Sequence, residues 1–325
     1  MNEQPLISVV ITCHDYKEYV AQAVDSVLAQ TYSNIELIII DDGSTDGSLS
    51  VIEKYRDRAR IVSHENRGIV SVRNEALTMV GGEFICFLDA DDYFSEGYVE
   101  QMCQVAETYG ADVVYPNWRM FGEGREESWT DFAEFEPRLL QLQRIHCTAE
   151  SLIRFSAIGP HRFESEEVAE DWDFFVGLSL AGARFKLARD CFINYRLKKN
   201  GRGARRDMSD DVACFAAILR RYQARYPADV IDPEQLVIEK LTAEHQIRTR
   251  LRHEVDGLRE EIGDVRREVE ALQREVYNVK QDRDYLRARN EDLVQQLDRI
   301  EGSRSFRAAR IAALPWRIAR ELRSH

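Results

Sequence analysis

The chain has 325 residues, 44% of them hydrophobic, which is enough for two domains of ordinary size or for one large domain with an extension. Its net charge of −13 argues against a nucleic-acid-binding protein, because such proteins carry a basic surface. The six cysteines form no Cys-x-x-Cys pair, and the sequence shows neither a signal-peptide pattern nor an apolar run of about 20 residues. We therefore expect a cytoplasmic protein with reduced thiols.

The first half of the chain alternates apolar runs with amphipathic segments. The apolar runs predict strands at 6–12, 35–40, 60–64, 84–88 and 111–118. The amphipathic segments predict helices at 16–30, 48–58, 69–79 and 96–109. Strands and helices that alternate at this spacing predict a doubly wound, mostly parallel α/β sheet. Residues 119–150 show no clear period, so we expect them to be irregular.

Acidic residues follow two of these predicted strands. Asp89, Asp91 and Asp92 come directly after the fourth strand, and Asp41 and Asp42 end the second. Ligands of open α/β sheets bind at the carboxyl ends of the strands. Carboxylates suit Mg²⁺ or Mn²⁺, and these ions in turn suit diphosphates. Taken alone, the two clusters also fit a solvated acidic turn and a helix-capping turn.

Six segments together resemble family 2 glycosyltransferases. They are Ile7–Thr12, Gln30-Thr31-Tyr32, Glu36–Ser44, Asn66-x-Gly68, Arg73-Asn74 and Phe87–Asp92. The resemblance extends over roughly residues 5–195. It implies a GT-A fold, which is Rossmann-like with a mostly parallel sheet, and inverting transfer of a sugar from a nucleotide-diphosphate sugar.

The resemblance also implies roles for individual residues. Asp42 would contact the base or ribose of the nucleotide, Arg73 would help to hold the nucleotide, and Asp89 would face the ribose. Asp91 would ligate the Mn²⁺ or Mg²⁺ ion that bridges the diphosphate. We place Thr12, at the end of the first strand, in the same nucleotide-sugar site. From the residues alone, Arg73 also fits a surface salt bridge.

The motif Glu-Asp-Trp-Asp at 170–173 opens a predicted helix and resembles the Glu-Asp motif of the family. Inverting transfer needs a carboxylate that takes the proton from the acceptor hydroxyl. The resemblance assigns this role to Asp171, with Glu170 or Asp173 as alternatives. Acidic residues in a first helical turn are also favoured by the helix dipole, which is a purely structural explanation.

A departure from the family occurs at Lys198. Many relatives have Tyr-Arg-x-His here, whereas this chain has Tyr195-Arg196-Leu197-Lys198. An ammonium group can neutralise a diphosphate but is a poor metal ligand. We place Lys198 in the nucleotide-sugar site. The sequence has no Gln-x-x-Arg-Trp motif, which argues against a processive synthase.

Residues 251–300 carry a heptad repeat. Apolar residues alternate four and three apart, with β-branched residues at most a positions and mostly Leu at d, and Asn290 stands at an a position. The flanking g and e positions pair acid with base, as Glu254 with Arg259, Glu261 with Arg266, Glu275 with Lys280 and Asp282 with Arg287. This pattern predicts a parallel, in-register homodimer. A solvated single helix would explain neither the apolar seam nor the charge pairing.

The last residues, 303–325, hold six arginines and one acid among apolar residues that include Trp316. A basic amphipathic segment of this kind predicts contact with an anionic membrane surface, and partner binding is the alternative. The sequence thus predicts a GT-A domain at 1–230, a long α-helical coiled coil at 234–302 and a basic amphipathic tail at 303–325.

We therefore expect a glycosyltransferase on the inner face of a bacterial cell membrane. It would act on a glycan or lipid-linked acceptor in surface polysaccharide synthesis. Two alternatives stay open: a non-catalytic coiled-coil scaffold with a degenerate transferase domain, and a sugar-1-phosphate nucleotidyltransferase. The second would need a Gly-rich loop after the first strand, where the sequence has Cys13-His14-Asp15-Tyr16 instead.

Overall fold

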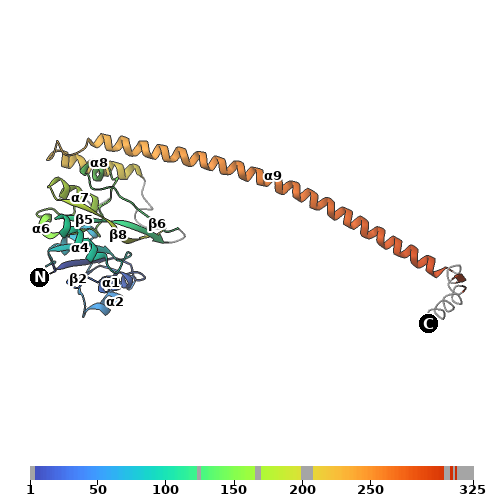
Figure 1. The fold of residues 1–325 in the computed structure, drawn as a ribbon, viewed down its shortest axis with the longest axis horizontal. Coiled ribbons are helices and arrows are strands. Elements are labelled where there is room, and N and C mark those ends of the chain that lie inside the picture. Colours follow the sequence, from blue (N-terminus) through green and yellow to red (C-terminus); the bar gives the residue numbers. More distant parts are fainter. Residues whose placement is uncertain are drawn as a thin grey trace. The chain divides into compact units, whose positions relative to one another are not determined.

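The computed structural model describes residues 4–122, 126–164, 170–198, 208–303, 308–309 and 312 (Figure 1). The chain divides into two compact units, residues 1–243 and 244–325. The first unit contains the sheet and the helices packed on it, and the second contains most of one long helix. The basic amphipathic tail predicted at 303–325 lies almost entirely outside the described residues.

The described residues of the first unit form one eight-stranded mixed sheet in the order β3-β2-β1-β4-β7-β5-β6, with β8 paired to β5. The strands are β1 (Ile7–Cys13), β2 (Ile35–Asp42), β3 (Arg60–His64), β4 (Phe84–Asp89), β5 (Val113–Gly122), β6 (Ser128–Trp129), β7 (Leu152–Arg154) and β8 (Phe185–Leu197). Strands β3, β2, β1 and β4 are parallel, as are β5 and β8. The fold is therefore a mostly parallel α/β sheet, as the alternating pattern predicts.

Helices connect and cover these strands. They are α1 (Val20–Leu28), α2 (Ser48–Ile52), the 3₁₀ helix η1 (Glu53–Tyr55), α3 (Ile69–Ala76), α4 (Tyr98–Tyr109), α5 (Pro137–Gln141), α6 (Phe155–Ile158), α7 (Glu170–Leu180), α8 (Met208–Gln223) and α9 (Pro233–Gly302). Gly110 ends α4 in the left-handed conformation (φ 58°), which a residue with a side chain rarely adopts. Because α4 stops there, β5 can return alongside the sheet.

The core lies on both faces of the sheet, which explains why the strands read as continuous apolar runs. Val9 and Ile11 of β1 pack in the cluster that includes α1 and α4. Val10 lies between them in sequence and packs in the opposite cluster, with residues of α3 and α7. With both faces of the sheet covered by core residues, the carboxyl ends of the strands are the expected place for a ligand.

Two features of the sheet differ from the sequence-based expectation. Residues 119–150 were expected to be irregular, yet they include the end of β5, the short strand β6 and the helix α5. Strand β7 was not expected, and it lies antiparallel between β4 and β5. It has three residues, which is too short for a visible hydrophobic period. Ahead of β7, the carbonyl oxygen of Ala149 accepts a 3.1 Å hydrogen bond from the N–H of Phe87.

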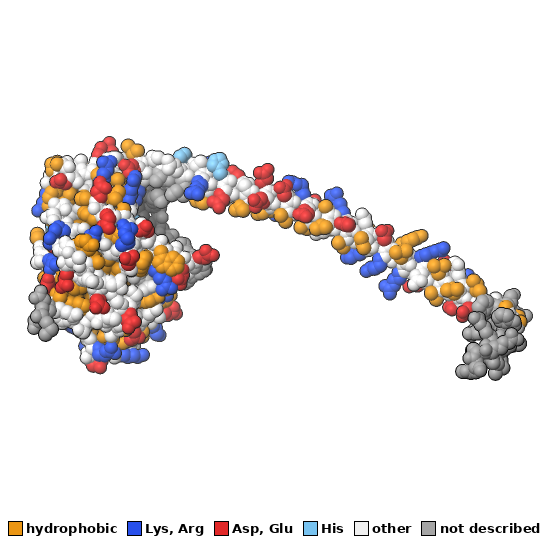
Figure 2. Space-filling view, in the orientation of Figure 1, with side chains coloured by type: hydrophobic (Ala, Val, Ile, Leu, Met, Phe, Trp, Pro, Cys, Tyr) orange, Lys and Arg blue, Asp and Glu red, His pale blue; other side chains and the backbone are white. Residues whose placement is uncertain are grey.

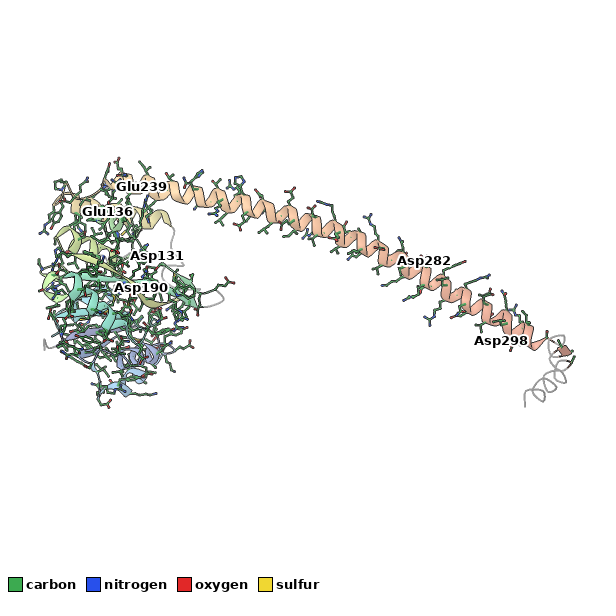
Figure 3. All side chains as sticks on the ribbon, viewed as in Figure 1. Asp131, Glu136, Asp190, Glu239, Asp282 and Asp298 are labelled. Atoms are coloured by element: carbon green, nitrogen blue, oxygen red, sulfur yellow. The ribbon has the colours of Figure 1, made fainter. Side chains whose placement is uncertain are left out.

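The second unit is dominated by the helix α9. Its apolar seam residues from Leu251 to Ile300 are 44–63% exposed, and Figure 2 shows a row of hydrophobic side chains along one side of the helix. Charged side chains such as those of Asp282 and Asp298 also extend from α9 (Figure 3). Within the described part of the chain, no helix is both long and apolar enough to cross a membrane.

Candidate active site

A cavity of about 210 Å³ opens at the carboxyl ends of β1, β2 and β4. It is lined by Thr12, Cys13, His14, Tyr16, Asp42, Asn66, Gly68, Ile69, Val72 and Asp89. Strand β1 pairs with both β2 and β4, and Thr12 stands opposite Asp89 in the β1–β4 register. The acidic ends of the second and fourth strands therefore meet at one crevice, the place where ligands bind in open α/β sheets.

Asp42 is buried at the end of β2 and holds the loop that leads into α3. Its carboxylate accepts the backbone N–H of Arg67 at 2.7 Å and that of Gly68 at 3.0 Å. The imidazole Nδ1 of His64 lies 3.4 Å from the same carboxylate. Asp42 therefore shapes the cavity wall, and a contact with a base or ribose would be added to these bonds.

Arg73 lies beneath the cavity rather than on the surface, which removes the surface salt bridge as an explanation. Its guanidinium is bonded at 3.1 Å to Asp89 and at 3.0 Å to Glu170. The rings of Phe87 and Phe163 lie 5.8 and 5.6 Å from the guanidinium carbon. Burial by itself would lower the pKa of Arg73, but the two carboxylates outweigh it and the pKa is raised. Arg73 thus carries a permanent charge between the end of β4 and the start of α7.

Asp91 is paired with Lys198. The two side chains are 13% and 19% exposed, and the Lys198 Nζ lies 2.5 Å from the Asp91 Oδ2. The same Nζ lies 3.8 Å from the ring centroid of Tyr16, a residue that lines the cavity. Burial and the nearby charge of Asp89 raise the pKa of Asp91, and the bond to Lys198 opposes this rise. Lys198, predicted in the nucleotide-sugar site, thus lies at its edge.

Asp92 is turned away from the cavity. It is 3% exposed, and its Oδ1 accepts the backbone N–H of Arg196 at 2.6 Å. The Arg196 Nε donates a 2.8 Å bond to the carbonyl oxygen of Asp91. Burial raises the pKa of Asp92 well above its usual range. Asp92 therefore fastens the acidic turn to the end of β8. Of the three acids, Asp89 lines the cavity and Asp91 lies at its edge, beside Lys198.

The residues around Asp91 do not fit the metal ion that the resemblance implies. Asp91 is already neutralised by an ammonium group, Asp89 is bonded to Arg73, and Asp92 is bonded to the backbone. Among the described residues, no three His, Cys, Asp or Glu side chains gather closely enough to hold a metal ion. A divalent ion at the Asp91 Oδ2 would compete with Lys198 for that oxygen, because the two cations repel each other at such short range.

The first turn of α7 carries three acids, and the structure gives them different surroundings. Glu170 is paired with Arg73, and the buried Asp173 is paired with Arg221. Asp171 forms no ion pair within the described part of the chain, and its carboxylate accepts the N–H of Trp172 at 2.7 Å. Burial and the charge of Glu170 raise the pKa of Asp171 to about 6. These surroundings favour Asp171 over its two neighbours as a proton acceptor.

Glu150 is a member of this site that sequence reasoning missed. It is 2% exposed, and its pKa is raised to about 8, first by burial and then by the charge of Asp89. Glu150 lies close to the acidic turn because the segment before β7 runs beside β4. There the Cys86 thiol contacts the Glu150 carbonyl oxygen. No local motif marks this position. Arg196 was also missed, although the Tyr-Arg dipeptide before Leu197 signals it.

The fold is a mostly parallel α/β sheet with an acidic crevice at the carboxyl ends of β1, β2 and β4. Residues 8–159 match the family model described as Glycosyl transferase family 2. The UDP-Glc:alpha-D-GlcNAc-diphosphoundecaprenol beta-1,3-glucosyltransferase WfaP of Escherichia coli is 37% identical over 116 residues, which cover 35% of this chain and 46% of WfaP. The chain spans less than half the length of the curated relatives it matches. These findings support a family 2 glycosyltransferase domain.

Solved structures with low identity share the fold. Residues 1–349 of TarS from S. aureus, in complex with UDP-GlcNAc, match with a TM-score of 0.58 and 20% identity over 73% of this chain and 71% of that one. The mannosyltransferase PcManGT of Pyrobaculum calidifontis, in complex with GDP-Man and Mn²⁺, matches with a TM-score of 0.55 and 16% identity over 74% and 69% of the two chains. At this identity the likeness shows the fold alone.

Proposed function

We propose that the chain is an inverting glycosyltransferase that moves a sugar from a nucleotide-diphosphate sugar to an acceptor hydroxyl. The observation that carries the proposal is the link through Arg73, which bonds Asp89 at the nucleotide crevice and Glu170 beside Asp171. A donor bound at Asp89 and a base on α7 would then lie on two sides of one buried guanidinium. The match to the glycosyltransferase family supports the same activity.

In the proposed reaction, Asp171 takes the proton of the acceptor hydroxyl while its oxygen attacks the anomeric carbon. The bond from that carbon to the diphosphate breaks, and the nucleoside diphosphate leaves with the electron pair. A base works best when its pKa is near the working pH. The pKa of Asp171, about 6, leaves the group ionised at pH 7 and basic enough to accept a proton.

The nucleotide-sugar site comprises Thr12, Asp42, Arg73, Asp89 and Lys198. The Thr12 hydroxyl donates a 3.2 Å bond to Asp89, so it sets the direction of that carboxylate, and Asp42 shapes the loop on the opposite wall. TarS is solved with UDP-GlcNAc and PcManGT with GDP-Man, which supports a nucleotide-sugar donor here. The resemblance also implies Mn²⁺ or Mg²⁺ at Asp91, and the pairing of Asp91 with Lys198 argues against that ion.

The acceptor we propose is a glycan or a lipid-linked sugar in bacterial surface polysaccharide synthesis. The similarity to WfaP, which is named as a glucosyltransferase for a diphosphoundecaprenol-linked sugar, supports this acceptor class. We place the protein in the cytoplasm, with peripheral contact at the inner face of the membrane through the basic residues of 303–325. The proposed organisation is a transferase domain at 1–230, a coiled coil at 234–302 and a membrane-contacting tail.

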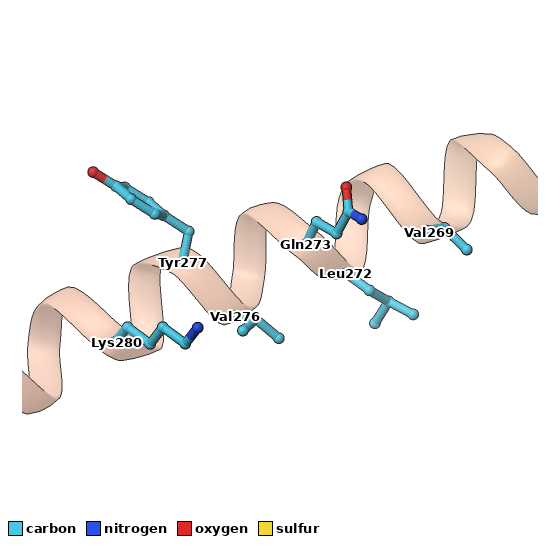
Figure 4. Close-up of a pocket in the computed structure, with 6 residues that line it drawn as sticks. All are labelled: Val269, Leu272, Gln273, Val276, Tyr277 and Lys280. Carbon is cyan, nitrogen blue, oxygen red and sulfur yellow. The ribbon is translucent and has the colours of Figure 1, made fainter.

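We also propose a parallel homodimer through residues 251–300. Val269, Leu272 and Val276 project from one side of α9, and Gln273 and Tyr277 project from the other (Figure 4). A second copy of the same helix would cover this exposed apolar row. In a parallel pair the acidic g positions meet the basic e positions, whereas an antiparallel pair would bring acid against acid and base against base. Charge complementarity therefore selects the parallel arrangement.

The test of the transferase proposal is a screen of nucleotide sugars. The full chain is incubated with UDP-, GDP-, ADP-, CDP- and dTDP-linked sugars, and the released nucleoside diphosphate is measured with and without Mn²⁺. Slow release from one donor, lost in Asp171→Asn, supports a transferase. Absence of both release and nucleotide binding would favour the non-catalytic scaffold instead. Formation of a nucleotide sugar from a sugar 1-phosphate would favour the nucleotidyltransferase.

A further inference from the structure

We propose that the ammonium group of Lys198, rather than a divalent metal ion, is the cation that faces the donor diphosphate at Asp91. The inference rests on the proposed function, because the diphosphate belongs to the nucleotide-sugar donor. It replaces the metal expected from the resemblance with a side chain of this protein. The transferase would then bind its donor without Mn²⁺ or Mg²⁺.

Lys198 contacts the carboxylate that the resemblance assigns to the metal ion. Its Nζ lies 2.5 Å from the Asp91 Oδ2, on the carboxylate predicted to hold the metal. The aromatic ring of Tyr16 lies under the same Nζ at 3.8 Å, and that of Tyr19 lies 5.8 Å away. A ring face attracts a cation, so the carboxylate and the two rings form a seat for a single positive charge. Lys198 fills that seat.

Arg196 stabilises the backbone around this cation site. This residue bonds the carbonyl oxygen of Asp91 and, through its own backbone N–H, the carboxylate of Asp92. Its guanidinium lies 4.6 Å from the rings of both Tyr19 and Phe121. The end of β8 is thereby held against the acidic turn, and Lys198 lies two residues after Arg196 in the sequence. The approach of Lys198 to Asp91 is therefore built into the fold rather than being a chance surface contact.

A bound diphosphate also requires a cation to balance its negative charge. A diphosphate would bring further negative charge to a crevice that already holds Asp89 and Asp91. Arg73, the other cation predicted for this site, is buried and shared between Asp89 and Glu170. Lys198 has three N–H donors, and a bond to Asp91 leaves donors for phosphate oxygens. A lysine in this role acts as a point charge toward phosphate.

The test is calorimetric titration of the full chain with UDP, GDP, ADP, CDP and dTDP, in EDTA and in Mn²⁺. We expect the wild type to bind its preferred nucleotide in EDTA within about threefold of its affinity in Mn²⁺. Lys198→Met should weaken binding in EDTA roughly 10- to 100-fold, the range for loss of a charged hydrogen bond. Lys198→Arg should retain binding in EDTA because it retains the charge. Lys198→His should bind in a Mn²⁺-dependent way, because imidazole is a metal ligand.

Lys186→Met is the matched control. Lys186 lies on β8, the strand that ends just before Lys198. It pairs with Glu134 at 3.0 Å and lies 4.6 Å from the ring centroid of Tyr109, so it also combines an acid with an aromatic ring. Its loss should leave nucleotide binding unchanged. Thermal melting of every variant checks that each one is folded.

A second readout uses Mn²⁺ alone, followed by its electron paramagnetic resonance signal. The wild type should leave the ion free, and Lys198→His should retain more of it, because the imidazole joins Asp91 as a second ligand. Nucleotide binding that needs Mn²⁺ in the wild type and survives Lys198→Met would overturn the inference. If no nucleotide binds under either condition, the proposed function falls as well.

Discussion

The guanidinium of Arg73 lies 3.1 Å from the carboxylate of Asp89, although one residue is on α3 and the other at the end of β4. The side chain of Arg73 is 3% exposed, and that of Asp89 is 38% exposed. The buried charge therefore supports a carboxylate that is open to the crevice. The same guanidinium also bonds Glu170 and so fixes the start of α7 against the sheet.

Arg73→Met should destabilise the protein by about 2 kcal/mol, because it leaves Asp89 and Glu170 without their shared partner. The loss stays below that of a fully buried ion pair because Asp89 is partly exposed. Urea unfolding followed by circular dichroism measures the change. Arg184→Met is the control, since Arg184 is 65% exposed in its pair with Asp112 and its loss should change the unfolding free energy much less than the loss of Arg73. Equal losses in the two variants would contradict the bridging role of Arg73.

Asp171→Asn should lower turnover by about 100-fold or more, the range for loss of a general base, and leave donor binding nearly unchanged. The reason is that Asp171 acts on the acceptor proton and holds no part of the nucleotide. Steady-state rates and nucleotide titration on the same preparation separate the two effects. Asp112→Asn is a remote control that should change neither quantity. A parallel loss of turnover and nucleotide binding would show that Asp171 is a structural or nucleotide-binding residue.

The rate should also depend on pH through Asp171. Its pKa is raised to about 6, and only the ionised form accepts a proton, so kcat/KM should fall as the pH drops through about 6. Above pH 7 this group adds no further pH dependence. A rate profile between pH 5 and pH 8, measured with the donor found in the screen, tests the expectation. A rate that rises toward pH 5 would rule out Asp171 as the base.

Glu150 should make the protein less stable as the pH rises. Its folded-state pKa of about 8 lies above the ordinary glutamate pKa of 4.5, so the folded chain keeps a proton that the unfolded chain has released. Unfolding free energy therefore falls between about pH 4.5 and pH 8 through this group. Glu150→Gln mimics the protonated form, so the free energy of this variant should fall less over the same range.

Unfolding in urea at pH 5, 6.5 and 8 measures this difference for wild type and variant. Glu107→Gln, on the exposed side of α4, is the control and should keep the wild-type pH dependence. Other raised acids, such as Asp171, contribute equally to both proteins, so only the difference is informative. Identical pH dependence in wild type and Glu150→Gln would show that Glu150 is ionised in the folded protein.

Val276→Asp should convert the proposed dimer into a monomer. Val276 is an a-position residue with 53% of its surface exposed on the single helix, and an acid there would be buried against its copy. Gln281→Asp adds the same charge at an f position of α9, and it should stay dimeric. Light scattering of the full chain gives the mass. A wild-type protein that is already monomeric would refute the coiled coil.

Sequence alone indicated the parallel sheet and the meeting of Asp42 with Asp89, because both follow from local patterns. Continuous apolar runs identify buried parallel strands, and the ends of parallel strands share one edge. The heptad seam of 251–300 is likewise a property of the sequence, because the positions of a helix face repeat at a constant interval. The resemblance to the family supplied Asp171, which no periodicity singles out.

Only the tertiary structure decided which charges are compensated by which partners. The pairs Arg73–Asp89 and Lys198–Asp91 join residues 16 and 107 positions apart in the sequence. Glu150 comes beside the acidic turn through β7, a three-residue strand with no hydrophobic period of its own. Burial and ion pairing depend on what the fold brings within a few ångströms. For that reason the sequence indicated Asp42, Asp89 and Asp91, whereas the packing of the sheet added Glu150 and set the partners of these acids.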